Sequence, residues 1–135
     1  MKEDIILLLR EIDKVSEDAF VKINFESYVS KLMEHAKIFS DYRSNQLIAF
    51  IAYYSNDPLN ERGYLSMLAI HPEYQNRGYG KKLLNLAIED LRSENFKYFD
   101  LQVVMNNKRA LKIYQSFGFN LLRMDKKCVF MRLIL

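Results

Sequence analysis

The stretch Gln75-Asn76-Arg77-Gly78-Tyr79-Gly80 decides the fold of this chain, together with the segments that flank it. An apolar, strand-like segment, Tyr64–Ile70, precedes it, and a helix-forming run, Lys81–Leu91, follows it. A strand, a tight glycine turn and a helix build an anion site, because the first turn of a helix has unpaired N–H groups and a positive dipole end. Glycines let a phosphate approach these donors without a Cβ in the way. This stretch therefore predicts a site for a phosphorylated ligand.

Length and composition predict one domain that covers residues 1–135, and half of the residues are hydrophobic, which argues against disorder. The formal net charge is +3, and the basic residues are dispersed. Lys81-Lys82 and Lys126-Lys127 are only pairs, so we expect no nucleic-acid partner and no polybasic membrane anchor. A mild positive charge suits an anionic cofactor without proving one.

Cysteine usage and hydropathy predict the compartment. Cys128 is the only cysteine, so no internal disulfide can form, which fits a reducing cytoplasm. The apolar run Ile5–Leu9 is shorter than a signal-peptide core of ~7–15 residues. No segment approaches the ~20 apolar residues of a membrane span. We therefore expect a soluble, cytoplasmic protein that has no contact with a membrane.

Hydrophobic periodicity outlines the elements around the central turn. Helical spacing predicts helices over about 5–15, 25–36 and 108–117, in addition to the one at Lys81–Ser93, and Gly118 is placed to end the helix before it. Strands are predicted at 47–54, 64–70, 99–105, 120–124 and 127–135, with a short strand starting at Ile38-Phe39 and a turn over Asp41–Gln46. This order predicts an α/β fold with a mixed sheet rather than a doubly wound one.

The glycine turn contains neither the Gly-x-Gly-x-x-Gly of dinucleotide folds nor the Gly-Lys-Ser/Thr of a P-loop. A lone Gly-x-Gly is typical of an ordinary turn, but a second motif follows the next strand: Asn107-Lys-Arg-Ala110-Leu-Lys-Ile-Tyr114-Gln-Ser-Phe-Gly118-Phe119. Together, Gln-x-x-Gly-x-Gly and Asn-x-x-Ala-x-x-x-Tyr-x-x-x-Gly-Phe resemble the acetyl-CoA loop and the next helix of the GCN5-related N-acetyltransferase (GNAT) superfamily. The likeness covers about Tyr64 to Phe119 and implies a mostly antiparallel sheet flanked by about four helices.

The resemblance implies roles for the residues that match these motifs. In this family the strand before the loop splays from its neighbour, and pantetheine pairs with it. Leu68 and Ile70 would make those main-chain bonds, with Ala69 between them, although Leu68 and Ile70 would also suit plain core packing. The pyrophosphate of acetyl-CoA would be wrapped by Asn76, Arg77, Gly78, Tyr79, Gly80 and Lys81. Gln75 would order the loop, Asn107 would bond the pantetheine arm or cap its helix, and Ala110 would leave room for the cofactor.

Tyr114 is the residue that the resemblance assigns to catalysis. When an amine attacks the thioester, coenzyme A leaves as a thiolate, and a phenol of pKa ~10 can donate a hydrogen bond or a proton to it. An ordinary core tyrosine on an apolar helix face, beside Ile113 and Phe117, is the alternative. The oxyanion would be held by a backbone N–H near Leu68. We expect no metal.

The general base is not identified by the sequence. Where some family members have a Glu on the strand before the Asn motif, this chain has Gln102, which cannot take a proton. The remaining candidates are Glu61, Asp57, His71 or a chain of waters. His71 precedes Pro72 and suits a turn residue, and Glu61 suits a solvated surface position.

The acceptor would be a small-molecule or peptide amine. Acidic residues of the N-terminal helices, with Phe25 and Tyr28, would suit a cationic amine, but they equally suit the outer faces of amphipathic helices: Glu11, Asp13, Glu17, Asp18 and Glu26. The missing base leaves open a non-catalytic acyl-CoA-binding sensor domain. The sequence leaves the choice between a monomer and a homodimer open.

Overall fold

The computed structural model describes residues 1–15 and 23–135, which form four α-helices and six strands of one sheet. The helices are α1 (Lys2–Val15), α2 (Phe25–His35), α3 (Tyr79–Ser93) and α4 (Lys108–Ser116), and a short 3-10 helix, η1, covers Pro72–Tyr74. The strands are β1 (Lys37–Arg43), β2 (Gln46–Tyr54), β3 (Arg62–Ile70), β4 (Tyr98–Val104), β5 (Asn120–Met124) and β6 (Cys128–Ile134).

The strands lie in the order β1-β2-β3-β4-β6-β5. Only β3 and β4 run parallel, because α3 crosses back between them, and every other neighbouring pair is antiparallel. The prediction of a mixed, mostly antiparallel sheet flanked by four helices is therefore confirmed.

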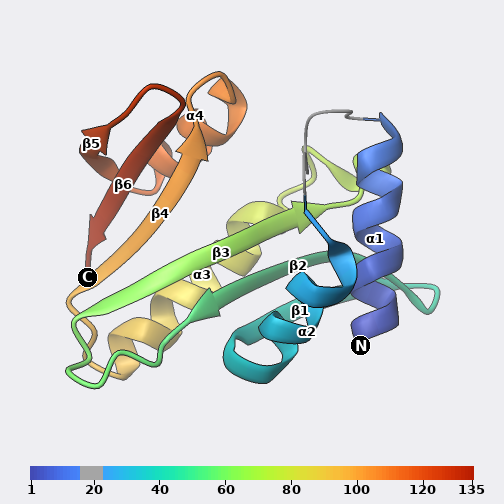
Figure 1. Cartoon of the computed structure of the whole chain (residues 1–135), viewed down its shortest axis with the longest axis horizontal. Coiled ribbons are helices and arrows are strands. Elements are labelled where there is room, and N and C mark those ends of the chain that lie inside the picture. The colour runs from blue at the N-terminus through green and yellow to red at the C-terminus, as the bar shows by residue number, and fades with distance from the viewer. Residues whose placement is uncertain (16–22) are drawn as a thin grey trace.

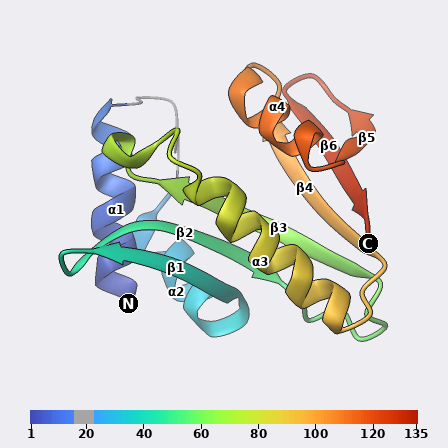
Figure 2. The same cartoon turned by 180° about the vertical axis from the view of Figure 1, so that it is seen from behind.

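The helices cover the sheet unevenly (Figures 1 and 2). α1 and α2 pack on one face of its N-terminal half, where Ile5, Leu9 and Leu32 meet Phe50 of β2 in one apolar cluster. α3 and α4 lie on the opposite face, in a larger cluster that includes Leu84 and Phe99. On the face of the sheet where α1 and α2 pack, no helix among the described residues covers β4, β6 and β5. No helix within residues 1–15 and 23–135 is long and apolar enough to cross a membrane.

The first strand is longer than the sequence predicted, and the turn predicted over Asp41–Gln46 is correspondingly shorter. β1 runs on to Arg43, and the turn contains only Ser44 and Asn45, whose φ angles are 50° and 63°. Two positive φ angles favour a tight hairpin that matches the twist of the strands. Polar residues hid the strand because β1 is an edge strand, whose side chains are only partly buried.

Other boundaries shift by a few residues. α3 begins at Tyr79 rather than Lys81, and β3 begins at Arg62 rather than Tyr64. Gly118 follows α4 with a φ of 98°, which confirms its predicted role at the helix end.

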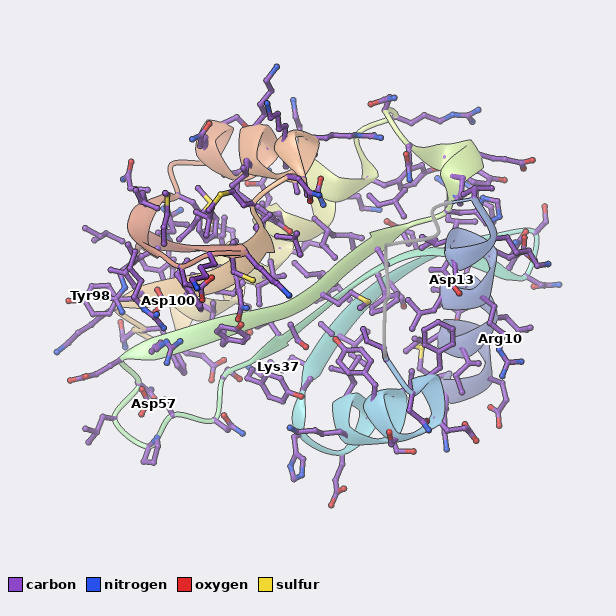
Figure 3. All side chains as sticks on the ribbon, turned by 45° about the horizontal axis from the view of Figure 1, so that its top comes forward. Arg10, Asp13, Lys37, Asp57, Tyr98 and Asp100 are labelled. Carbon is purple, nitrogen blue, oxygen red and sulfur yellow. The ribbon has the colours of Figure 1, made fainter. Side chains whose placement is uncertain are left out.

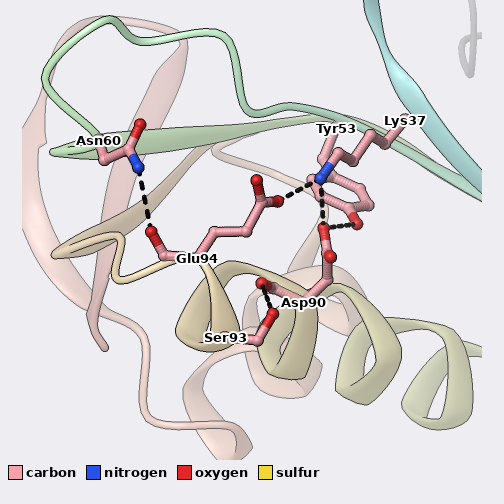
Figure 4. A network of polar contacts seen from close by, with 6 residues as sticks. All are labelled: Lys37, Tyr53, Asn60, Asp90, Ser93 and Glu94. Atoms are coloured by element: carbon pink, nitrogen blue, oxygen red, sulfur yellow. Dashed lines mark hydrogen bonds and ion pairs between the residues drawn. The ribbon is translucent and has the colours of Figure 1, made fainter.

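A polar network ties the start of β1 to the C-terminal end of α3 (Figure 4). Lys37 Nζ lies 3.0 Å from Asp90 Oδ2 and also pairs with Glu94, while the Tyr53 hydroxyl donates to Asp90 at 2.6 Å. Burial and the bond to Asp90 raise the pKa of Tyr53. Burial alone would raise the pKa of Asp90, but the bonds from Tyr53 and Lys37 outweigh it and lower the pKa. The network lies far along α3 from the glycine turn and holds the helix against the sheet.

Candidate active site

The parallel strands β3 and β4 diverge, and this divergence creates the site. They pair only where Arg62–Tyr64 face Tyr98–Asp100. β3 then continues to Ile70 and β4 to Val104 without pairing with each other, so one edge of each strand is left open (Figure 1). Unpaired main-chain groups along such an edge can bind an extended ligand as if it were an added strand.

The direction of the main-chain groups on β3 can be read from its pairing with β2. The N–H of His71 donates to the carbonyl of Ile48 on β2 at 2.7 Å. Because these groups alternate in direction along a strand, the N–H groups of Leu68 and Ile70 point away from β2, toward the open edge. The carbonyl of Ile70 accepts a bond from Gln75 Nε2 at 3.3 Å. The N–H groups of Leu68 and Ile70, the two residues predicted to offer main-chain bonds, therefore face the open edge, while Ala69 is buried.

The glycine turn leads from the end of β3 into α3. Asn76 has a φ of 63°, and Gly78, the N-cap of α3, has a φ of 90°. No side chain caps the helix, and a Cβ on Gly78 would meet no atom within 4 Å. The first N–H groups of α3 are thus left without a side-chain cap, which is the arrangement that binds anions at helix N-termini.

Arg109 of α4 fastens this turn from the other side of the open edge. Its guanidinium donates to Gln75 Oε1 at 2.7 Å and to Asn76 Oδ1 at 2.9 Å. Gln75 in turn reaches the carbonyl of Ile70. One arginine therefore links α4, the glycine turn and the end of β3, and the sequence interpretation did not include it. Its place inside the Asn107 motif was the signal that could have found it.

One cavity of about 690 Å³ joins these parts. It is lined by Ile12, Val15, Leu68, Ile70, Pro72, Tyr74, Gln75, Asn76, Gly78, Tyr79, Gly80, Lys81, Asn107, Arg109, Ala110, Ile113 and Tyr114. Of the residues predicted for the site, only Ala69 and Arg77 are outside this lining. Lys81 and Arg109 are its charged members, and no carboxylate lies among the described residues of the lining. The cavity therefore suits an anionic ligand.

The lining also includes residues that sequence reasoning missed. Ile12 and Val15 extend it onto α1, and Val15 is 69% exposed. Arg77, by contrast, is not part of the lining, and its guanidinium lies 5.3 Å from the centre of the ring of Tyr74, which is. Apolar periodicity marked Ile12 and Val15 only as helix-face residues, because the contact depends on how α1 packs beside η1.

Tyr114 projects from α4 into the cavity lining and is almost wholly buried. Its ring meets the ring of Phe119 edge-on, with centroids 5.7 Å apart. Burial raises the pKa of Tyr114 to about 12, so its phenol stays protonated near neutral pH. The structure gives it both features that were weighed from the sequence, an apolar core contact and access to the cavity.

Asn107 and Ala110 stand at the start of α4. Asn107 Oδ1 accepts the N–H of Ala110 at 3.2 Å, so Asn107 is the N-cap of the helix. Both residues line the cavity. The cap uses the oxygen of the Asn107 side chain and leaves its amide nitrogen available for a ligand.

The candidate bases do not lie in this cavity. Asp57 and Glu61 are in the loop between β2 and β3, at the far end of β3 from the glycine turn (Figure 3). Asp57 accepts the N–H groups of Leu59 and Arg62, and Glu61 pairs with Lys97 at 3.6 Å. His71 caps η1 through Nδ1, which accepts the N–H of Glu73 at 3.1 Å. Their roles here are those of turn and surface residues.

The acidic residues of the N-terminal helices have surface positions. Glu11 pairs with Lys14 at 3.2 Å and Glu26 pairs with Lys2 at 3.6 Å. Asp13 projects from α1 in Figure 3. Glu17 and Asp18 lie outside the described residues.

A bulge interrupts the pairing of β3 with β2, along the edge of β3 that faces away from β4. Ala52 of β2 faces Met67 and Tyr53 faces Leu65, so Ser66 is the extra residue. The hydroxyl of Tyr28, on α2, lies 2.7 Å from Ser66 Oγ. This hydrogen bond ties α2 to the bulge of β3.

The sequence profile of the Acetyltransferase (GNAT) family matches residues 6–119, and the chain therefore belongs to this family. Among curated relatives, Spermine/spermidine N(1)-acetyltransferase of Bacillus subtilis is 34% identical over 84 residues, 58% of this chain and 55% of that protein. [Ribosomal protein bS18]-alanine N-acetyltransferase of Haemophilus ducreyi is 36% identical over 76 residues, 56% and 52% of the two chains. N-alpha-acetyltransferase 30 of Saccharomyces cerevisiae is 36% identical over 58 residues, 43% and 33%. The match thus spans about half or less of each curated relative.

Solved structures share the fold over most or nearly all of the chain. The PaiA N-acetyltransferase of Thermoplasma acidophilum, in complex with coenzyme A, has a TM-score of 0.82 at 21% identity and covers 99% of this chain and 92% of its own. The ribosomal-protein-S18-alanine N-acetyltransferase of Escherichia coli has a TM-score of 0.70 at 23% identity and covers 83% and 77%. At these identities the likeness establishes the fold.

Proposed function

We propose that this chain is an acetyl-CoA-dependent N-acetyltransferase that moves an acetyl group to a primary amine by direct transfer within a ternary complex. One observation carries the proposal: the open edge of β3, the glycine turn at the start of α3 and Tyr114 line the same cavity. Membership of the acetyltransferase family and the amine acceptors named for the curated relatives support it.

Acetyl-CoA would lie along the open edge with its pyrophosphate at the start of α3. The N–H groups of the first helical turn would hold the pyrophosphate, and Lys81 and Arg109 would add positive charge. The main-chain groups of Leu68 and Ile70 would pair with pantetheine. When bound, acetyl-CoA supplies the activated acyl group.

The transfer forms a carbon–nitrogen bond and breaks a carbon–sulfur bond. The amine lone pair attacks the thioester carbonyl, and a backbone N–H near Leu68 would stabilise the oxyanion. The nitrogen then gives up its extra proton to water, and the thiolate leaves as the amide forms. At sulfur, the general-acid role predicted for Tyr114 would take the form of hydrogen-bond donation. Because its pKa is about 12 and that of a thiol is ~8.5, it stabilises the thiolate mainly by donating a hydrogen bond, and the thiolate takes its proton from solvent.

Calorimetry with acetyl-CoA and coenzyme A, followed by detection of free thiol on a panel of amines, tests the proposal. Binding with thiol release on one amine class supports the enzyme. Binding without release across small amines, polyamines and peptides would favour the sensor domain. Lys81→Glu should weaken acetyl-CoA binding, whereas Lys31→Glu, the same change on the exposed side of α2, should not. If the unmodified protein does not bind acetyl-CoA, the proposal fails.

A further inference from the structure

A second cavity lies on the face of β4, β6 and β5 that α3 and α4 leave uncovered. Its volume is about 210 Å³. The lining residues are Arg62, Asp100, Leu101, Leu122, Arg123, Phe130, Met131 and Arg132. Three of these carry a positive charge, and among the described residues of the lining only Asp100 carries a negative one. Within the lining, positive charges therefore outnumber negative ones, and outside it Asp57 lies near Arg62 and Asp125 near Arg123.

Asp100 is buried and both of its carboxylate oxygens are already bound. Arg132 donates through Nε to Oδ1 at 2.8 Å and through Nη2 to Oδ2 at 2.9 Å. Arg62 donates through Nε to Oδ2 at 2.7 Å. Asp100 thus fixes two guanidinium groups but neutralises only one charge. A cationic ligand would find no free carboxylate in this lining.

Each of the three guanidinium groups also lies over an aromatic ring of the same region. The Cζ atom of Arg123 is 3.8 Å from the centre of the Phe130 ring, that of Arg132 is 4.1 Å from Tyr98, and that of Arg62 is 5.4 Å from Tyr64. Stacking of this kind holds a guanidinium plane in place and leaves its edge free to donate. Within the described residues, the terminal nitrogens of Arg62 and Arg123 and Nη1 of Arg132 have no hydrogen-bond partner.

The position of the cavity connects it with the reaction. Asp100 faces Tyr64 across the β3–β4 pair and Arg132 across the β4–β6 pair, so all three project on one face at the closed end of the divergence. α3 and α4, which would hold the cofactor, cover the other face (Figure 2). Figure 3 locates this region through Tyr98 and Asp100 of β4. An amine that reaches the thioester through the opening would come from the side of the arginines.

We propose that Arg62, Arg123 and Arg132 form an acceptor subsite for a carboxylate, and that the acceptor is therefore an amine that also bears a carboxylate. This inference rests on the proposed acetyl transfer for its place in the reaction. Guanidinium groups match a carboxylate with paired N–H donors, whereas the same charges repel a polyamine. The fixed Asp100 serves to orient two of the arginines rather than to bind the amine.

The test compares acceptors that are matched in length and differ in charge. With acetyl-CoA saturating, 4-aminobutyrate should be acetylated with a kcat/KM about tenfold or more above that of 4-aminobutanamide, and spermidine should be poorer than both. Arg123→Gln should reduce this preference several-fold, and Arg123→Glu should reverse it in favour of spermidine. Arg92→Gln, the same loss of charge on α3, should leave it unchanged. Arg132 is left unchanged, because its loss would leave the buried Asp100 paired with Arg62 alone.

A second measurement does not depend on turnover. In the free protein, 4-aminobutyrate should shift the arginine Nε–H resonances of Arg62, Arg123 and Arg132 in nitrogen-15 spectra, and 4-aminobutanamide should not. Equal rates on the matched pair, or no shift with 4-aminobutyrate, would overturn the subsite even if acetyl-CoA binds. Shifts in a protein that fails to bind acetyl-CoA would support the subsite and reject the proposed transfer.

Discussion

Arg109 on α4 and Gln75 in the glycine turn are joined by a hydrogen bond of 2.7 Å, and the same guanidinium reaches Asn76. Asn76 holds a positive φ, which costs a residue other than glycine some free energy. The arginine therefore holds the turn in the conformation that presents the start of α3 to the cavity. It also links that turn to the helix that carries Asn107 and Tyr114.

The first prediction concerns this link. Arg109→Ala should weaken acetyl-CoA binding about tenfold, because the turn loses both its fixed geometry and a nearby positive charge. Arg109→Lys should restore the charge without the paired bonds and recover only part of the affinity. Lys108→Ala, at the exposed neighbouring position, is the matched control. Calorimetry with acetyl-CoA measures all three, and equal affinity in Arg109→Ala and wild type would show that the link is not needed.

Much of this site could be predicted from sequence because its parts are local. Gly78 and Gly80 stand within one turn, and Asn107, Ala110 and Tyr114 stand in one short segment, so they form compact motifs through which the family resemblance assigned them. The open edge of β3 was predicted through the family resemblance, and the limited pairing at Arg62–Tyr64 is in accord with it.

Contacts between distant segments were not predictable in this way. Arg109 reaches 33 and 34 residues back to Asn76 and Gln75, and Arg132 reaches 32 residues back to Asp100. From the sequence alone, Arg109 and Arg132 cannot be told apart from the other dispersed basic residues. The length of β1 was underestimated for a related reason, since the polar residues of an edge strand show little hydrophobic periodicity.

The second prediction concerns Tyr114. Tyr114→Phe should lower kcat about a hundredfold, because the leaving thiolate loses its hydrogen-bond donor, while acetyl-CoA affinity stays the same. The ring remains to pack against Phe119, so the fold should be kept. Tyr28→Phe, which removes a hydroxyl from α2, provides a comparison for the loss of any phenol. A kcat within twofold of wild type would assign Tyr114 to packing alone.

The third prediction concerns pH. No carboxylate lies among the described residues of the large cavity, so the amine would reach the thioester after losing its proton to water. The rate at subsaturating amine should then rise with pH up to the pKa of the acceptor itself, ~10.4 for a lysine-type amine. Tyr114 should not limit the profile below this point, because its phenol remains protonated up to its pKa of about 12.

A comparison of two acceptors with different amine pKa values shows whether the amine or a base on the enzyme titrates. If the midpoint of the kcat/KM profile moves with the pKa of the acceptor, the amine alone titrates. A midpoint near neutral pH that stays fixed for both acceptors would reveal a base on the enzyme and contradict the prediction.

The fourth prediction concerns the network of Figure 4. Tyr53→Phe should destabilise the fold by about 1 kcal/mol, because the hydroxyl bond to Asp90 is lost from a buried position. Tyr54→Phe, the same change at the next residue, serves as the control, because the hydroxyl of Tyr54 makes no comparable bond among the described residues. Denaturant unfolding measures both, and acetyl-CoA affinity should be unchanged in each.

The pH dependence of this difference follows from Asp90. Its pKa in the folded protein is lowered, so the stabilisation is complete above the ordinary carboxyl pKa and is lost as the pH falls through the folded value. The stability difference between wild type and Tyr53→Phe should therefore be constant near neutral pH and shrink below about pH 4. A difference that persisted unchanged in acid would mean that the ionised carboxylate of Asp90 is not what the Tyr53 hydroxyl stabilises.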